Sequence, residues 1–146
     1  MLFWFEMQVS LAIFTLISFT SRLNLVLMKK VLIAEDSSVI QNLAKKILEF
    51  QNFEIHAVKN GQQVLDELAK ADFDIILLDI NMPVMDGWEF MEEMKDINSK
   101  INKKITIYIV SSSIAPEDKT KSKTFEIFDY ISKPISVDDI KSIAEK

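Results

Sequence analysis

The sequence predicts an α/β fold, in which a single five-stranded parallel sheet is covered by helices on both faces. Two observations lead to this prediction. From about residue 28 onward, short apolar runs alternate regularly with stretches of helical periodicity. Several of the apolar runs also end in charged or hydroxyl side chains, as expected at the carboxyl edge of a parallel sheet, where open α/β folds place their ligand sites.

The first half of this pattern begins with a strand at residues 31–34, which ends at Glu35 and Asp36. A helix over about 38–50 follows, with Ser37 or Ser38 as a suitable N-cap. Its predicted apolar stripe has helical spacing and consists of Ile40, Leu43, Ala44, Ile47 and Leu48. A second strand at 54–58 leads through a turn into a helix that carries Val64, Leu65 and Leu68.

The second half centres on the apolar run 75–78, which ends at Asp79 and enters a loop containing Pro83 and Gly87. A helix at about 88–97 follows, in which the apolar residues at helical spacing are predicted to be core: Trp88, Met91 and Met94. The remaining predicted elements are a strand at 105–110 ending in Ser111, a helix from Pro116, a short strand at 130–131 and a last helix from Val137.

Residues 1–27 are a different kind of sequence, apolar and carrying only Glu6 and Arg22 as charges. The favoured interpretation is that translation starts at Met28, because Met28 leads directly into the first strand. The alternative is a membrane anchor, although Arg22 and Asn24 interrupt the apolar run and the hydropathy criterion is only marginally met. We therefore expect two parts, an apolar segment at 1–27 and one domain at 28–146.

Composition excludes several kinds of site. The chain of 146 residues has no cysteine, which excludes disulfides and thiolate metal sites. The single histidine, His56, cannot form a histidine metal cluster and is interpreted as a packed or solvated strand residue. A net charge of −5 does not favour nucleic acid as a partner.

The residues at the predicted strand ends point to phosphoryl chemistry. Glu35, Asp36 and Asp79 offer the hard oxygen ligands that suit Mg²⁺. A hydroxyl at Ser111 and an ammonium at Lys133 suit a phosphoryl group.

These residues occur in an order that resembles the receiver domain of two-component response regulators, over about residues 28–146. The resemblance rests on Glu35-Asp36, on Asp79 with its following turn, on Ser111 and on Lys133-Pro134. It implies the flavodoxin-like strand order 2-1-3-4-5 and a stand-alone domain like the chemotaxis regulators. In that family Asp79 would be the phosphoacceptor, and Lys133, preceding a cis peptide, would pair with it.

The resemblance also implies roles for the neighbouring residues. Asp36 and Asp79 would bind Mg²⁺ directly, the backbone carbonyl of Asn81 would add a ligand, and Glu35 would act through bound water. Ser111 would hydrogen-bond a phosphoryl oxygen, although Ser112 and Ser113 follow it and the assignment could shift by one. Tyr130 matches an aromatic residue that changes rotamer with Ser111, while Asn81 and Ser113 would tune hydrolysis.

The predicted function is a single-domain response regulator that is switched by phosphorylation and is not a turnover enzyme. Its partners would be a sensor histidine kinase or a histidine phosphotransfer protein and a downstream protein target, with homodimerisation on phosphorylation left open. We expect a cytoplasmic protein, or an inner-membrane-anchored one with the receiver in the cytoplasm if residues 1–27 are a true anchor.

Three alternatives remain open at this point. The domain could be a membrane-tethered receiver or a degenerate receiver that never accepts phosphate. It could also be an aspartyl-phosphate phosphatase, but those enzymes need a general acid two residues after the nucleophile, and Asn81 occupies that position.

Phe125 and Phe128 belong either to a partner surface or to the core.

Overall fold

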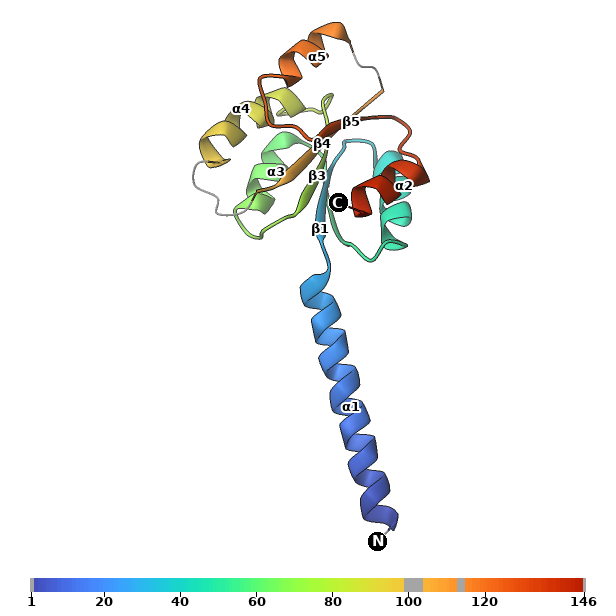
Figure 1. Cartoon of the computed structure of the whole chain (residues 1–146). Helices are drawn as coiled ribbons and strands as arrows, with labels where there is room; N and C mark the ends of the chain where they lie inside the picture. Colours follow the sequence, from blue (N-terminus) through green and yellow to red (C-terminus); the bar gives the residue numbers. More distant parts are fainter. Residues whose placement is uncertain (1, 99–103, 113–114, 146) are drawn as a thin grey trace.

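The structure, a computed structural model, describes residues 2–98, 104–112 and 115–145. Five parallel strands form one sheet in the order β2-β1-β3-β4-β5 (Figure 1). The strands are β1 (Lys30–Ala34), β2 (Glu54–Val58), β3 (Ile75–Asp79), β4 (Thr106–Ser111) and β5 (Asp129–Ser132). The predicted fold class and strand order are confirmed.

The helices lie on both faces of the sheet, with α3, α4 and α5 on one side and α2 and α6 on the other (Figure 1). Their bounds are α1 (Leu2–Leu27), α2 (Ser38–Glu49), α3 (Gly61–Leu68), α4 (Gly87–Asn98), α5 (Pro116–Ser122) and α6 (Val137–Ala144). Ser37 is the N-cap of α2, where its side chain accepts a hydrogen bond from the backbone N–H of Ile40. The elements from β1 to α6 thus fall within a few residues of their predicted positions.

Two apolar layers result from the alternation of side chains along the strands. On the face covered by α3 and α4, Leu32, Ile76 and Ile109 are fully buried. On the opposite face, Val31, Leu77 and Val110 pack against α2 and α6. All five residues of β3 are buried, as expected for the central strand of a parallel sheet.

The predicted core of α4 is confirmed, while the predicted stripe of α2 is partly wrong. Trp88, Met91 and Met94 are all buried. In α2, however, Leu43 is 45 % exposed and Gln41 is buried in its place. Gln41 is on the inner side of the helix because its amide has backbone acceptors there, which a count of apolar residues cannot reveal.

Helix α1 extends away from the sheet and its covering helices (Figure 1). The side chains described in it, those of residues 8–20, are exposed. Within the part of the chain that the structure describes, no helix combines the length and the apolar character needed to cross a membrane.

His56 lies on β2 as the sequence predicts, half-buried and packed edge-on against Phe73. Its Nε2 is 3.1 Å from Oε1 of Glu54, and its Nδ1 is 3.7 Å from Oε2 of Glu67. His56 is on the β2 edge of the sheet, and its contacts are those of a structural side chain.

Val84, in the loop after β3, has a positive φ of 70°, which strains a β-branched residue. Because its side chain is 84 % exposed, replacing it removes little packing. We expect Val84→Asn to raise the free energy of unfolding by about 1 kcal/mol, since asparagine tolerates this conformation better. Thermal unfolding of the variant beside Val39→Asn, at a 79 % exposed valine within α2, would measure this gain. A stabilisation of equal size in both variants would argue against relief of backbone strain.

Candidate functional site

The carboxyl ends of β1, β3, β4 and β5 meet at one edge of the sheet and bring distant residues together. The parallel register pairs Ala34 with Leu78 and Asp79 with Val110, so Glu35 and Asp79 follow neighbouring strands to the same edge. Ser111 pairs with Ser132, and Lys133 comes directly after. The structure therefore places together the acids, the hydroxyl residue and the lysine that the sequence singles out.

Asp79 is the central residue of this edge and is only 4 % exposed. Its Oδ2 is 2.8 Å from Nζ of Lys133. Its Oδ1 accepts a hydrogen bond of 3.3 Å from the backbone N–H of Asn81. Asp79 is thus fixed at the end of β3 by one ammonium and one backbone donor.

Glu35 is equally buried and shares the same lysine. Its Oε2 is 2.5 Å from Nζ of Lys133, and its Oε1 accepts a hydrogen bond of 3.1 Å from the backbone N–H of Ser37. Asp36, in contrast, is exposed, and its carboxylate has no hydrogen-bond partner among the residues that the structure describes. One carboxylate oxygen from each of Glu35, Asp36 and Asp79 lies within 4.8 Å of the other two.

The close packing of these charged groups shifts the pKa values of Glu35 and Lys133. Burial raises the pKa of Glu35, and the hydrogen bonds from Lys133 and Ser37 offset this only in part. Burial lowers the pKa of Lys133, but its hydrogen bonds to Asp79 and Glu35 outweigh burial and hold that pKa above its ordinary value. Lys133 is therefore a charged ammonium that compensates two buried acids.

Gln41 is the residue of this region that the sequence analysis missed. Its side-chain amide donates two hydrogen bonds of 2.7 Å, one to the backbone oxygen of Glu35 and one to that of Val58. The backbone N–H of Glu35 also donates to the oxygen of Val58. Gln41 thereby ties the ends of β1 and β2 together and fixes the backbone that presents Glu35 and Asp36. An amide among the apolar positions of the predicted helix was the only signal of this role.

The loop after β3 is held against the site by backbone contacts. Gly87 donates from its N–H to the oxygen of Ile80, and a Cβ on Gly87 would lie 2.5 Å from the backbone oxygen of Asp79. Asp86 caps α4, because its Oδ1 accepts from the N–H groups of Trp88 and Glu89, each at 2.8 Å. The loop can pass this close to Asp79 only with glycine at position 87.

Ser111 and Tyr130 lie on neighbouring strands. Ser111 is buried at the end of β4, and its backbone oxygen accepts from the N–H of Lys133 at 2.9 Å. Ser113 lies outside the described residues. Tyr130 is half-buried, and its hydroxyl donates to the backbone oxygen of Asp118 at 3.0 Å. The Lys133-Pro134 peptide is cis, as the resemblance implies.

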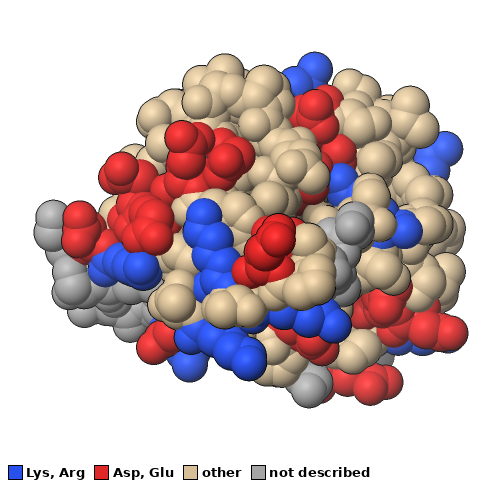
Figure 2. All heavy atoms as spheres, turned by 90° about the horizontal axis from the view of Figure 1, so that it is seen from above, with Lys and Arg blue, Asp and Glu red and all other residues tan. Residues whose placement is uncertain are grey.

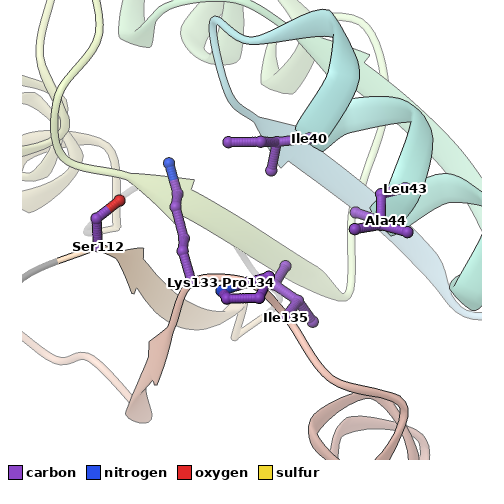
Figure 3. A pocket seen from close by; sticks show the side chains of 7 residues that line it. All are labelled: Ile40, Leu43, Ala44, Ser112, Lys133, Pro134 and Ile135. Atoms are coloured by element: carbon purple, nitrogen blue, oxygen red, sulfur yellow. The ribbon is translucent and has the colours of Figure 1, made fainter.

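A largely apolar pocket of about 260 Å³ lies beside Lys133. It is lined by Ile40, Leu43, Ala44, Ser112, Lys133, Pro134 and Ile135. Figure 3 shows the Lys133 side chain rising between Ser112 on one side and Ile40 of α2 on the other. The view onto the carboxyl edge of the sheet shows acidic and basic side chains side by side (Figure 2).

The sheet order and the acidic carboxyl edge are together those of a receiver domain. The chain belongs to this family, since the family model for the response regulator receiver domain matches residues 31–145. Within the family, receiver domains accept phosphoryl groups and act as switches, with an acidic cluster that binds Mg²⁺.

Solved structures and curated relatives agree with this assignment. The chemotaxis protein CheY4 of Vibrio cholerae is 29 % identical with a TM-score of 0.72, and the match covers 81 % of this chain and 97 % of that chain. A two component response regulator from Cytophaga hutchinsonii is 25 % identical with a TM-score of 0.73, covering 81 % of this chain and 95 % of that one.

Two curated relatives are much longer than the present chain. The cell cycle response regulator CtrA of Brucella ovis is 33 % identical over 111 residues, which are 76 % of this chain and 46 % of that protein. The hybrid signal transduction histidine kinase I of Dictyostelium discoideum is 34 % identical over 113 residues, 74 % of this chain and 6 % of that protein. The chain thus spans about half the length of CtrA and a small part of the hybrid kinase.

Proposed function

We propose that this protein is a phosphorylation-driven switch in which Asp79 accepts a phosphoryl group from a sensor histidine kinase or a histidine phosphotransfer protein. The observation that carries the proposal is the buried Asp79 carboxylate at the end of the central strand, 2.8 Å from the Lys133 ammonium and beside Glu35 and Asp36. No turnover of a small substrate is implied, because the phosphoryl group stays on the protein until water removes it.

In the proposed transfer, an Asp79 carboxylate oxygen forms a bond to phosphorus while the bond from phosphorus to the donor's imidazole nitrogen breaks. The imidazole leaves with that electron pair as a neutral ring, keeping the proton on its other nitrogen or, where that nitrogen carries none, taking one from water. The product on Asp79 is an acyl phosphate. Lys133 would move from the free carboxylate to a phosphoryl oxygen, and the Ser111 hydroxyl would donate to another.

The acidic cluster fits a hard divalent cation, because three carboxylates each offer an oxygen within a 4.8 Å span. Asp36 and Asp79 would bind Mg²⁺ directly, the Asn81 backbone carbonyl would be a further ligand, and Glu35 would act through bound water. The exposed position of Asp36 supports its role as a direct ligand, and the hydrogen bond from the Ser37 backbone to Glu35 supports an indirect role for that acid. Lys133 contacts both Glu35 and Asp79 and does not separate their roles. When bound, Mg²⁺ supplies positive charge that offsets repulsion between the carboxylate and the anionic phosphoryl group.

The modified protein would differ from the free one in its affinity for a downstream protein target. Ser111 and Tyr130 would move in response to the phosphoryl group. Their movement would shift the equilibrium between two conformations of the surface formed by α5, β5 and α6. Another protein or a second receiver would bind that surface. We place the protein in the cytoplasm and regard residues 28–146 as sufficient for the function.

The test is the intact mass after incubation with acetyl phosphate and Mg²⁺. We expect a gain of one phosphoryl group, with loss of the gain on chelation of Mg²⁺ and in Asp79→Asn. The matched control is Asp72→Asn, which makes the same change at an exposed residue just before β3. That control should be labelled like the parent.

Two results would count against the proposal. Labelling of Asp79→Asn at the parent rate would move the acceptor to another residue. A parent that accepts no phosphoryl group from acetyl phosphate or from its own kinase would leave a degenerate receiver as the better account.

A further inference from the structure

Helix α5 is joined to the sheet by polar contacts more than by apolar burial. Its seven residues, Pro116–Ser122, include no large apolar side chain, and Ser122 is the buried one among them. Its N-cap, Ala115, provides no side-chain hydrogen bond. A helix with so little apolar anchorage is easily displaced, so its position depends on the specific bonds that hold it.

Asp118 provides two of these bonds. Its Oδ1 accepts a hydrogen bond of 3.2 Å from Nε1 of Trp88 on α4. Its backbone oxygen accepts one of 3.0 Å from the Tyr130 hydroxyl on β5. One residue of α5 is therefore bonded both to the first turn of α4 and to the aromatic residue of β5.

Trp88 connects this arrangement to the phosphoacceptor loop. It follows Gly87, which packs directly on the backbone oxygen of Asp79 and is bonded to Ile80. The indole is only 7 % exposed and stacks on Phe125 at 5.7 Å between ring centroids. The ammonium of Lys121 lies 5.2 Å from the indole ring. A movement of the loop after Asp79 would therefore displace the buried indole of Trp88, and with it α5.

We infer that Trp88 is the positioning residue through which the Asp79 loop sets the place of α5, by its hydrogen bond to Asp118. The inference rests on the proposed function, since it supplies the route from the modified Asp79 to the surface that a partner reads. Trp88 takes no part in the phosphoryl transfer itself. It determines whether phosphorylation of Asp79 changes the position of α5 and the environment of Tyr130.

The test uses ¹⁹F NMR of the full chain labelled with 3-fluorotyrosine, because Tyr108 and Tyr130 are its two tyrosines. Tyr130→Phe assigns the resonances. Beryllofluoride with Mg²⁺ serves as the phosphoryl mimic, and intact mass after acetyl phosphate measures acceptance of the phosphoryl group. In the parent we expect the Tyr130 resonance to shift with the mimic.

In Trp88→Phe, which keeps an aromatic ring but lacks the N–H donor, we expect normal phosphoryl acceptance and loss of most of the Tyr130 shift. Asp118→Ala should reproduce this loss, while Asp118→Asn, which retains an acceptor oxygen, should keep the shift. Glu117→Ala on the same turn of α5 is the matched control and should behave like the parent. A merely structural role for Trp88 would lower the melting temperature without removing the response at Tyr130.

The outcomes separate the two proposals. Normal phosphoryl acceptance with a full Tyr130 shift in both Trp88→Phe and Asp118→Ala would overturn the role of Trp88 and leave the proposed function intact. A parent that accepts no phosphoryl group and shows no shift with the mimic would overturn both.

Discussion

Replacing Lys133 with methionine is expected to lower the free energy of unfolding at pH 7 by about 3 kcal/mol, because removing one partner leaves buried charge uncompensated. The Lys133 side chain is only 10 % exposed, and its ammonium contacts both Glu35 and Asp79. Methionine preserves much of the side-chain volume, so the loss reports the charge and its hydrogen bonds. Chemical denaturation in the absence of Mg²⁺ measures it. We also expect labelling of Asp79 by acetyl phosphate to fall sharply.

The pH dependence of this loss follows from the ionisation of the acids. The pKa of Glu35 already lies above the ordinary 4.5 because of burial, and removal of the Lys133 hydrogen bond must raise it further. A raised carboxyl pKa means that the folded variant binds protons more tightly than the unfolded chain. The stability deficit should therefore be full above the raised folded-state pKa of Glu35 and shrink as the pH falls through that pKa toward 4.5, the ordinary value of the unfolded chain.

Lys70→Met is the matched control for Lys133→Met. Lys70 also forms an ion pair, at 2.9 Å to Glu67, but its side chain is 67 % exposed. Solvent screens such a pair, so its loss should leave stability nearly unchanged at every pH. Equal losses in the two variants, or a Lys133→Met deficit that does not depend on pH, would contradict compensation of the buried acids by Lys133.

Addition of Mg²⁺ should stabilise Lys133→Met more than it stabilises the parent. A cation that binds only the folded state adds stability by mass action, and its affinity rises when no ammonium competes for the acids. Melting temperatures of both proteins over a Mg²⁺ titration check this expectation. A smaller gain in the variant than in the parent would argue that Lys133 helps to form the cation site.

The ends of the strands could be predicted because periodicity and polarity agree there. An apolar run that stops at Asp79 gives both the end of a buried strand and the place of a polar group, and the same holds for Glu35 and Ser111. In a parallel sheet these ends must meet at one edge, so the sequence also predicts which side chains gather. Lys133 could be placed because the Lys133-Pro134 dipeptide follows a short strand and matches the family's motif.

Features set by long-range contacts could not be predicted in the same way. Gln41 is buried because two backbone oxygens, that of Glu35 just after β1 and that of Val58 at the end of β2, lie within reach of its amide. The sequence left open whether Phe125 and Phe128 belong to the core or to a partner surface. Phe125 is buried against Trp88 and belongs to the core, whereas the side chain of Phe128 is 49 % exposed. The positive φ of Val84 likewise follows from the path of the loop and has no sequence signal.

Gly87→Ala is expected to be the most damaging small substitution near the site. The added Cβ would lie 2.5 Å from the backbone oxygen of Asp79 and 2.9 Å from Cα of Ile80. Both are backbone atoms, so relief requires the loop or the end of β3 to move. We expect a loss of about 3 kcal/mol in the free energy of unfolding, at the upper end for overpacking. In a domain of this size that corresponds to a fall of roughly 10 °C in the melting temperature.

Labelling should suffer beyond what the stability loss explains, because the clash displaces the backbone of the acceptor residue itself. Below the melting temperature we expect acetyl phosphate to label Gly87→Ala about tenfold more slowly or worse, since small misplacements of reacting groups are costly. Gly61→Ala is the matched control, in which the added Cβ meets chiefly the flexible side chain of Met85, with Cγ at 2.8 Å and the backbone oxygen at 3.0 Å. The control should lose less than half as much stability and keep its labelling rate. Equal labelling of the two variants would show that the tight contact at Gly87 serves folding alone and does not position Asp79.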